Sequence, residues 1–177
     1  RCAGSAQPSG MPAPPTRSPM ATTSIPPDTP ELSRAIFQYG VTPAVLHGVT
    51  EEELEATYQL AYELVMESQY EEALESAELL VRMDPGEQRY LFAFALCLQH
   101  VGEYASAARY YAEALVLQAT DAVCAFRMGE CLMAMEDLDE ARTAFELSVT
   151  LSWLDVDCTE VRELAQQHLD ELFSEGA

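Results

Sequence analysis

Lysine is absent from this chain of 177 residues, and all nine of its positive charges are arginines. Thirty Asp and Glu residues give the chain a formal net charge of −21. A field of this sign repels nucleic acid and anionic lipid headgroups, so we expect neither as a partner. The acidic surface is explained by solubility alone or by a basic protein partner, and the composition leaves both readings open.

Long hydrophobic runs are also missing. No stretch approaches the roughly 18 uninterrupted apolar residues that a membrane-spanning helix needs, so direct insertion into a membrane is not expected. Residues 1–30 lack the basic start, apolar centre and small-residue cleavage site of a secretory signal. We therefore predict a cytoplasmic protein. Its 49% hydrophobic content is nevertheless sufficient for the core of one compact domain.

Residues that could perform catalysis or bind a metal ion are scattered. His47, His100 and His168 are each separated by more than fifty residues, and no GxSxG, HExxH, P-loop or Gly-rich nucleotide motif occurs. We predict no enzymatic activity, no cofactor and no metal site. The odd number of cysteines and the absence of CxxC spacing favour free thiols over a disulfide or metal framework at Cys2, Cys97, Cys124, Cys131 and Cys158.

The composition changes near residue 30. Residues 1–30 contain eight of the ten prolines and almost no large apolar side chains, so they are predicted to be a disordered or polyproline-like tail. From residue 31 onward apolar residues recur at helical spacing, and 29 of the 30 acidic residues lie there. Residues 31–50 are predicted to form an N-terminal helical segment, with a short helix near 29–39.

An internal repeat of 34 residues is the strongest pattern in the chain. Three windows, at 54–87, 88–121 and 122–155, repeat a small residue at position 8 and alanine at position 20. Two antiparallel helices approach closely only where small side chains face each other, so this is the tetratricopeptide pattern. The resulting prediction is an all-α superhelix of three helix pairs over residues 51–155. The equivalent residues are Ala61, Ala95 and Gly129 at position 8, and Ala73, Ala107 and Ala141 at position 20.

The periodicity predicts helices near 51–68, 71–84, 87–101, 105–118, 121–135 and 139–152. Thr50 followed by three glutamates is a favourable start for the first of these, and Gly102 suits a left-handed turn in the second repeat. Residues 156–177 are predicted to contain a last helix, near 157–174, that caps the stack with a polar surface.

A groove for an extended peptide is the predicted functional site. The first helix of each pair lines the concave side of such a stack, where positions 2, 5, 9 and 12 of a window project. Position 5 is aromatic in all three repeats and is expected to face the groove rather than the paired helix, although core burial is the alternative for any one aromatic. Arg89 and Gln99 could bond the peptide backbone. The predicted groove residues are Tyr58, Tyr62, Val65, Arg89, Phe92, Leu96, Gln99, Phe126, Glu130 and Met133.

From about residue 36 to residue 173 the chain resembles the class II chaperones of bacterial type III secretion, the SycD, LcrH and IpgC type. A generic tetratricopeptide protein would not be expected to share the segment that leads into the first repeat. The pieces that carry the resemblance are residues 39–46 (YGVTPAVL), 53–62 (ELEATYQLAY) and 130–132 (ECL).

The resemblance implies a bacterial cytoplasmic chaperone that holds hydrophobic translocator proteins, soluble and unassembled before export, through a segment lying in the concave groove. It also implies a homodimer formed through the N-terminal segment. A general tetratricopeptide scaffold that bridges cytosolic proteins is the alternative. The residues expected at the dimer interface are Leu32, Ile36, Phe37, Val45 and Leu46.

Overall fold

The computed structural model describes residues 41–175, and this part of the chain contains helices and no strand. The predicted tail, the predicted helix near 29–39 and three expected dimer residues (Leu32, Ile36 and Phe37) lie outside the described residues. The all-α prediction is confirmed. The elements are α2 (Pro43–His47), α3 (Glu51–Met66), α4 (Tyr70–Met83), α5 (Gln88–His100), α6 (Tyr104–Leu117), α7 (Ala122–Ala134), α8 (Leu138–Ser152), the 3₁₀ turn η1 (Val156–Cys158) and α9 (Thr159–Glu175).

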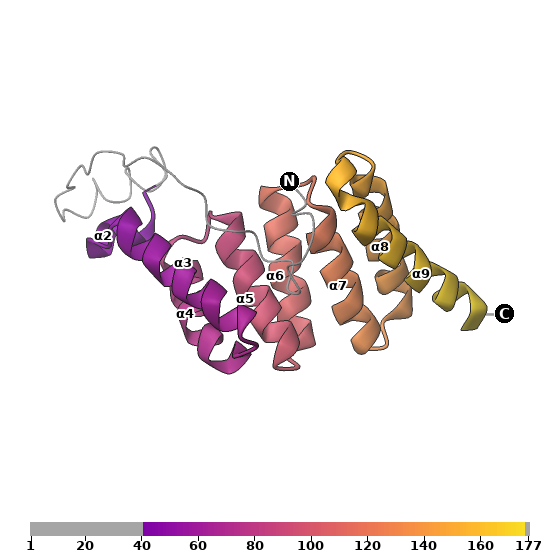
Figure 1. Ribbon diagram of the computed structural model, residues 1–177, viewed down its shortest axis with the longest axis horizontal. Coiled ribbons are helices and arrows are strands. Elements are labelled where there is room, and N and C mark those ends of the chain that lie inside the picture. Colours follow the sequence, from indigo (N-terminus) through magenta and orange to yellow (C-terminus); the bar gives the residue numbers. More distant parts are fainter. Residues whose placement is uncertain (1–40, 176–177) are drawn as a thin grey trace.

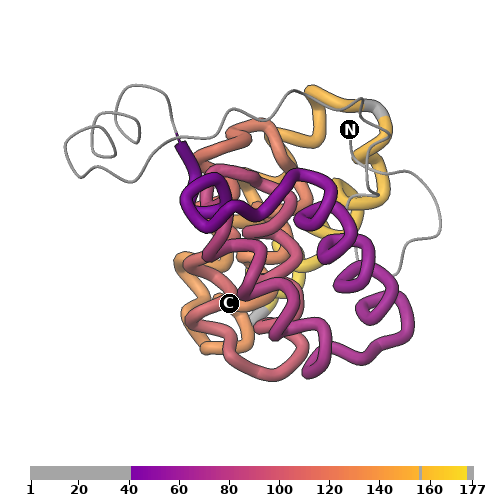
Figure 2. Tube along the Cα trace, turned by 90° about the vertical axis from the view of Figure 1, so that its left-hand side faces the viewer, coloured from indigo at the N-terminus to yellow at the C-terminus, as the bar shows by residue number. Residues whose placement is uncertain are grey.

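The helices stand side by side in a row that runs from α2 at one end to α9 at the other (Figure 1). Consecutive helices along the chain contact one another from α3 to α8, which gives the three predicted pairs α3–α4, α5–α6 and α7–α8. Figure 2 looks at the stack from the α2 end, with the later repeats behind the first. No helix in the described range is long and apolar enough to cross a membrane.

The helix boundaries follow from local chemistry. Thr50 and Glu53 form a capping box at the start of α3, in which the Glu53 N–H donates to Thr50 Oγ1 (3.2 Å) and the Thr50 N–H donates to Glu53 Oε2 (2.8 Å). The turn inside each pair contains a residue with positive φ at position 15 of the window. These residues are Ser68 (61°), Gly102 (87°) and Glu136 (64°), and only the glycine was predicted.

Small residues bring the paired helices together, as the repeat pattern predicts. A Cβ atom added to Gly129 of α7 would lie 2.7 Å from a ring carbon of Phe145 on α8, so the glycine is needed for this approach. Ala73, Ala107 and Ala141 have no exposed surface. The core is therefore built from close contacts between helices and not from long apolar side chains alone.

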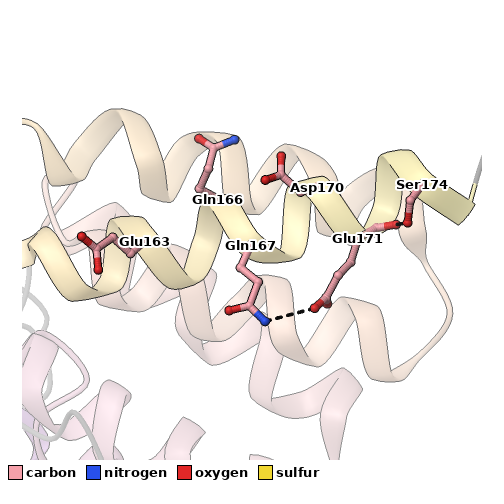
Figure 3. A pocket seen from close by; sticks show the side chains of 6 residues that line it. All are labelled: Glu163, Gln166, Gln167, Asp170, Glu171 and Ser174. Carbon is pink, nitrogen blue, oxygen red and sulfur yellow. Dashed lines mark hydrogen bonds between the residues drawn. The ribbon is translucent and has the colours of Figure 1, made fainter.

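The last helix ends the stack with a polar face. Ala165 and Leu169 are its buried side, and it packs mainly on α8. Position 8 of the window is Glu163 here, in place of the small residue of the three repeats. Figure 3 shows the hydrophilic side chains that line a shallow hollow along this helix, with Gln167 Nε2 donating to Glu171 Oε1 at 3.1 Å. No further helix could pack on this face without burying charge.

Candidate peptide-binding face

The first helices of the three pairs, α3, α5 and α7, carry all ten predicted groove residues. The structure divides them into two groups. Five are buried, namely Tyr58, Val65, Phe92, Leu96 and Phe126. Five are partly exposed, namely Tyr62, Arg89, Gln99, Glu130 and Met133. The binding role of all ten remains a prediction, and in the structure only the second group presents appreciable surface.

The expectation that position 5 faces away from the paired helix is wrong for Phe92 and Phe126. Phe92 packs edge-on against Tyr111 of α6, with ring centroids 5.5 Å apart, and Phe126 packs against Phe145 of α8 at 5.7 Å. The small residues at position 8 bring the two helices so close that these rings meet between them. The core alternative therefore describes these aromatics.

Arg89 is the centre of a polar cluster that joins the first two repeats. Its Nη2 lies 3.5 Å from Glu55 Oε2 on α3, and its Nε lies 3.3 Å from Glu87 Oε1. The guanidinium carbon stands 4.8 Å from the centre of the Tyr58 ring. A buried aromatic floor and two carboxylates thus fix the orientation of one cation.

A second cluster joins the second and third repeats. Gln99 Nε2 donates to Glu130 Oε2 at 3.0 Å, and Arg127 Nη1 reaches the same oxygen at 2.9 Å. The Tyr111 hydroxyl donates to Gln99 Oε1 at 2.9 Å, which ties this cluster to α6. We call these two groups, Glu55–Glu87–Arg89 and Gln99–Arg127–Glu130, the polar ladder. The face therefore consists of partly exposed polar side chains above buried aromatic rings.

The electrostatics of the first cluster favour the charged form of Arg89. Burial lowers the pKa of Arg89, but the hydrogen bond and charge of Glu87 and the charge of Glu55 outweigh it, so the pKa lies above its usual value. Burial raises the pKa of the Tyr58 hydroxyl well above its usual range. His100, on the same helix as Arg89, has a lowered pKa because of burial and the charge of Arg127.

The ladder pairs were not predicted, although the sequence contains a signal for one of them. Glu55 and Arg89 lie 34 residues apart, which is one repeat length, so they occupy the same position in successive windows. Opposite charges at equivalent positions of neighbouring repeats predict an ion pair between those repeats. Gln99 and Glu130 lie 31 residues apart, so the same rule does not find them.

The expected dimer residues are only partly described. On α2, Val45 is 45% exposed and Leu46 is 39% exposed. Apolar side chains therefore remain on the surface at this end of the stack, as expected if another surface covers them. The interface role of these two residues remains a prediction.

The prediction of free thiols holds for some of the cysteines and fails for one. Cys97, Cys124 and Cys131 are free and buried, as predicted. Cys158 is disulfide-bonded, so the prediction of a free thiol is wrong at that residue. Cys2 lies outside the described residues. Within residues 41–175 no group of three or more His, Cys, Asp or Glu side chains is placed to hold a metal ion.

A comparison with known protein families identifies the class of protein to which this chain belongs. Residues 46–147 match the family described as "Anaphase-promoting complex, cyclosome, subunit 3", a family of tetratricopeptide-like helical repeats. The match spans more than half of the chain, and the chain belongs to this family.

Individual proteins with a similar sequence or structure identify a smaller group within this class. The chain is 28% identical over 141 residues to low calcium response locus protein H of Yersinia pestis, which covers 78% of this chain and 82% of the relative. The type III secretion translocator chaperone SycD of Yersinia enterocolitica has a similar structure, with a TM-score of 0.67 and 25% identity over 73% of this chain and 97% of that one. The resemblance predicted from the sequence is confirmed.

A second similar structure contains a bound segment of another protein. PcrH, a protein of Pseudomonas aeruginosa, was solved in complex with the chaperone binding region of PopD. Its TM-score to this chain is 0.71, with 22% identity over 73% of this chain and 98% of that one, a likeness that concerns the fold.

Proposed function

We propose that the chain is a bacterial cytoplasmic chaperone for hydrophobic translocator proteins of a type III secretion system. It binds an extended segment of each translocator on the face formed by α3, α5 and α7, and so keeps the translocator soluble and unassembled before export. The observation that carries this proposal is its relationship to the translocator chaperone SycD along the described repeats. Its relatives are chaperones, and the proposal assigns no catalytic step to the chain.

The chemistry of the face supports peptide binding. Tyr62 and Met133 supply partly exposed apolar surface on α3 and α7. The polar ladder lies on α3, α5, α7 and the N-cap of α5, and its donors and acceptors suit the main chain of an extended peptide. A ligand that buries apolar side chains and also satisfies main-chain hydrogen bonds matches such a surface.

We also propose that the free protein is a homodimer formed through residues 31–50. Val45 and Leu46 supply exposed apolar surface on α2, and the same segment contains Leu32, Ile36 and Phe37. SycD is known in an alternative dimer, which shows that a chaperone of this fold associates with itself. Charged substitutions at Ile36 and Phe37 should give a monomer in light scattering. A wild-type protein that is monomeric at tens of micromolar concentration would contradict the dimer.

Co-expression tests the chaperone function directly. We expect that hydrophobic proteins encoded beside the gene become soluble when the chain is present. Calorimetry with the chaperone binding region of PopD then tests the face. Tyr62→Ala should weaken binding by about thirtyfold, which corresponds to about 2 kcal/mol for a central aromatic contact.

A matched control lies on the same helix. Leu60 is 50% exposed, and it occupies position 7 of the window, outside the predicted groove positions. Leu60→Ala should bind as wild type does, and both variants should keep the wild-type helical signal. If Tyr62→Ala and Leu60→Ala bind equally well, the face of α3, α5 and α7 is not the binding surface.

A further inference from the structure

Two atoms of the Glu55–Arg89 ion pair in the polar ladder lack a hydrogen-bond partner. Glu55 Oε1 and Arg89 Nη1 are both shielded from solvent, and neither has a partner within the described part of the chain. A buried donor or acceptor without a partner costs free energy, so native structures rarely retain one without a reason. Here one acceptor and one donor occur in the same ion pair, in which Glu55 Oε2 and Arg89 Nη2 are 3.5 Å apart.

The surroundings of the Glu55–Arg89 pair prevent its two unpartnered atoms from bonding to each other. Glu87 engages the Nε side of Arg89 at 3.3 Å, and Tyr58 lies against the face of its guanidinium. The remaining nitrogen is therefore held in a fixed direction. The two side chains are not sealed in the core, because 34% of Glu55 and 16% of Arg89 are exposed. A ligand on this face can reach the rim of the pair.

The main chain of an extended peptide supplies the complementary groups. In an extended strand the N–H and the C=O of one residue point to the same side, as they do in an antiparallel sheet. We propose that Glu55 and Arg89 form a clamp for the main chain of one residue of the bound segment. Both atoms are shielded in the free protein, so binding displaces the partly exposed Glu55 side chain. Glu55 Oε1 then accepts the N–H of that residue, and Arg89 Nη1 donates to its C=O.

This inference rests on the proposed function and adds a mode of recognition to it. Main-chain contacts are the same for almost every amino acid, proline excepted, so the clamp adds affinity without reading the side chains of the segment, whose register is set by the apolar contacts. One face could then hold translocators of different sequence. Side-chain preference would come from the apolar surface on either side of the clamp.

Methylated peptides test the clamp on the wild-type protein. The probe is the chaperone binding region of PopD, prepared as a series in which one backbone N–H at a time carries a methyl group. Methylation at the clamped residue should weaken binding by about tenfold or more, the usual effect of losing a hydrogen bond to a charged group. Methylation that nowhere weakens binding by as much as tenfold would overturn the clamp.

Variants of the protein then test whether the binding penalty of backbone methylation arises from the Glu55–Arg89 pair. Glu55→Gln keeps the shape of the side chain but removes its charge, so it should weaken binding of the unmodified peptide and reduce the penalty at the sensitive N–H. Asp139→Asn is the control, because Asp139 forms an exposed ion pair with Arg142 on α8. A Glu55→Gln protein that shows the full wild-type penalty would overturn the assignment.

The outcomes separate the two proposals. If the wild-type protein binds the unmodified peptide but the clamp tests fail, the chaperone function stands and the clamp is wrong. If the wild-type protein binds neither the PopD region nor the hydrophobic proteins encoded beside its gene, the proposed function fails and the clamp fails with it.

Discussion

Helices α5 and α9 occupy equivalent places in the repeat, yet they have opposite surroundings. Helix α5 is the first helix of the pair in the window that begins at residue 88. Helix α9 holds the same place in a window that would begin at residue 156. Nine of the thirteen residues of α5 are buried, whereas the buried hydrophobic residues of α9 are Ala165 and Leu169. Helix α5 lies between α4 and α6, and α9 has α8 as its main neighbour.

The difference is concentrated at position 8 of the window. Ala95 fills this position in α5 and has no exposed surface, while Glu163 fills it in α9 and is exposed. The stack ends where a charge replaces the small residue that a paired helix requires.

The largest expected effect is in the interior of the stack. Phe145 has no exposed surface and packs against Phe126 and His168, with ring centroids 5.7 and 4.9 Å apart. Phe145→Ala should lower the free energy of unfolding by about 3–5 kcal/mol, because it removes buried surface and leaves a cavity. Chemical denaturation followed by circular dichroism measures this.

The control for this change is at the end of the stack. Phe173 on α9 is 58% exposed, so Phe173→Ala should change the stability by no more than about 0.5 kcal/mol. Equal losses for the two variants would show that α9 is covered in solution and would remove the contrast between interior and end.

A smaller effect is expected where the two helices of a pair touch. In Gly129→Ala the new Cβ atom would lie 2.7–3.0 Å from three ring atoms of Phe145, which is fully buried and cannot move aside freely. Overpacking costs about 1–3 kcal/mol, which exceeds the gain of up to about 1 kcal/mol from replacing glycine in a helix. We expect a net loss of stability in the same denaturation experiment.

The equivalent change in α9 should behave differently. Glu163→Ala removes a charge from an exposed face and creates no close contact, so its effect should lie within about 0.5 kcal/mol of zero. A Gly129→Ala protein that is more stable than wild type would mean that α7 and α8 can separate without cost.

The repeat spacing explains why so much of the fold could be predicted. Close helix pairs require small residues where they touch, so the small residues at positions 8 and 20 indicate where the helices pair. The helices from α3 to α8 begin and end within two residues of their predicted limits. The sequence did not predict the short helix α2 as a separate element. Gly48 ends it with a φ of 70°, a local turn that the repeat pattern does not encode.

The candidate site was less predictable because window positions do not specify how far a side chain reaches. Phe92 and Phe126 lie at a position expected to face the groove, but their rings pack against Tyr111 and Phe145 of the paired helices and join the core. Ser68 and Glu136 adopt the left-handed conformation that favours glycine, and their side chains give no sign of it in the sequence. Both cases depend on contacts between helices, which override local preference.

The last prediction concerns buried thiols, and it compares α5 and α7 with α9 at position 10 of the window. Cys97 and Cys131 occupy this position in α5 and α7, and Ala165 occupies it in α9; all three are fully buried. Burial raises the pKa of each thiol from its usual 9.0 to about 12, with the charge of Glu130 adding to the effect at Cys131. Since thiolates form more easily in the unfolded chain, the stability associated with each thiol is complete below about pH 9.

This stability should be lost as the pH rises from about 9 towards 12. At pH 10 each thiol should already account for roughly 1.4 kcal/mol of the loss, the value for one pH unit above the pKa of the unfolded thiol. The double variant Cys97→Ala, Cys131→Ala adopts the residue that α9 has at this position. Between pH 7 and pH 10 it should lose about 3 kcal/mol less stability than wild type, measured by urea unfolding at both pH values. Buried tyrosines titrate in both proteins, so their contributions cancel in the comparison. Identical losses would show that the two thiols ionise as readily in the folded protein as in the unfolded chain, and that the interior of the stack is as open to water as its end.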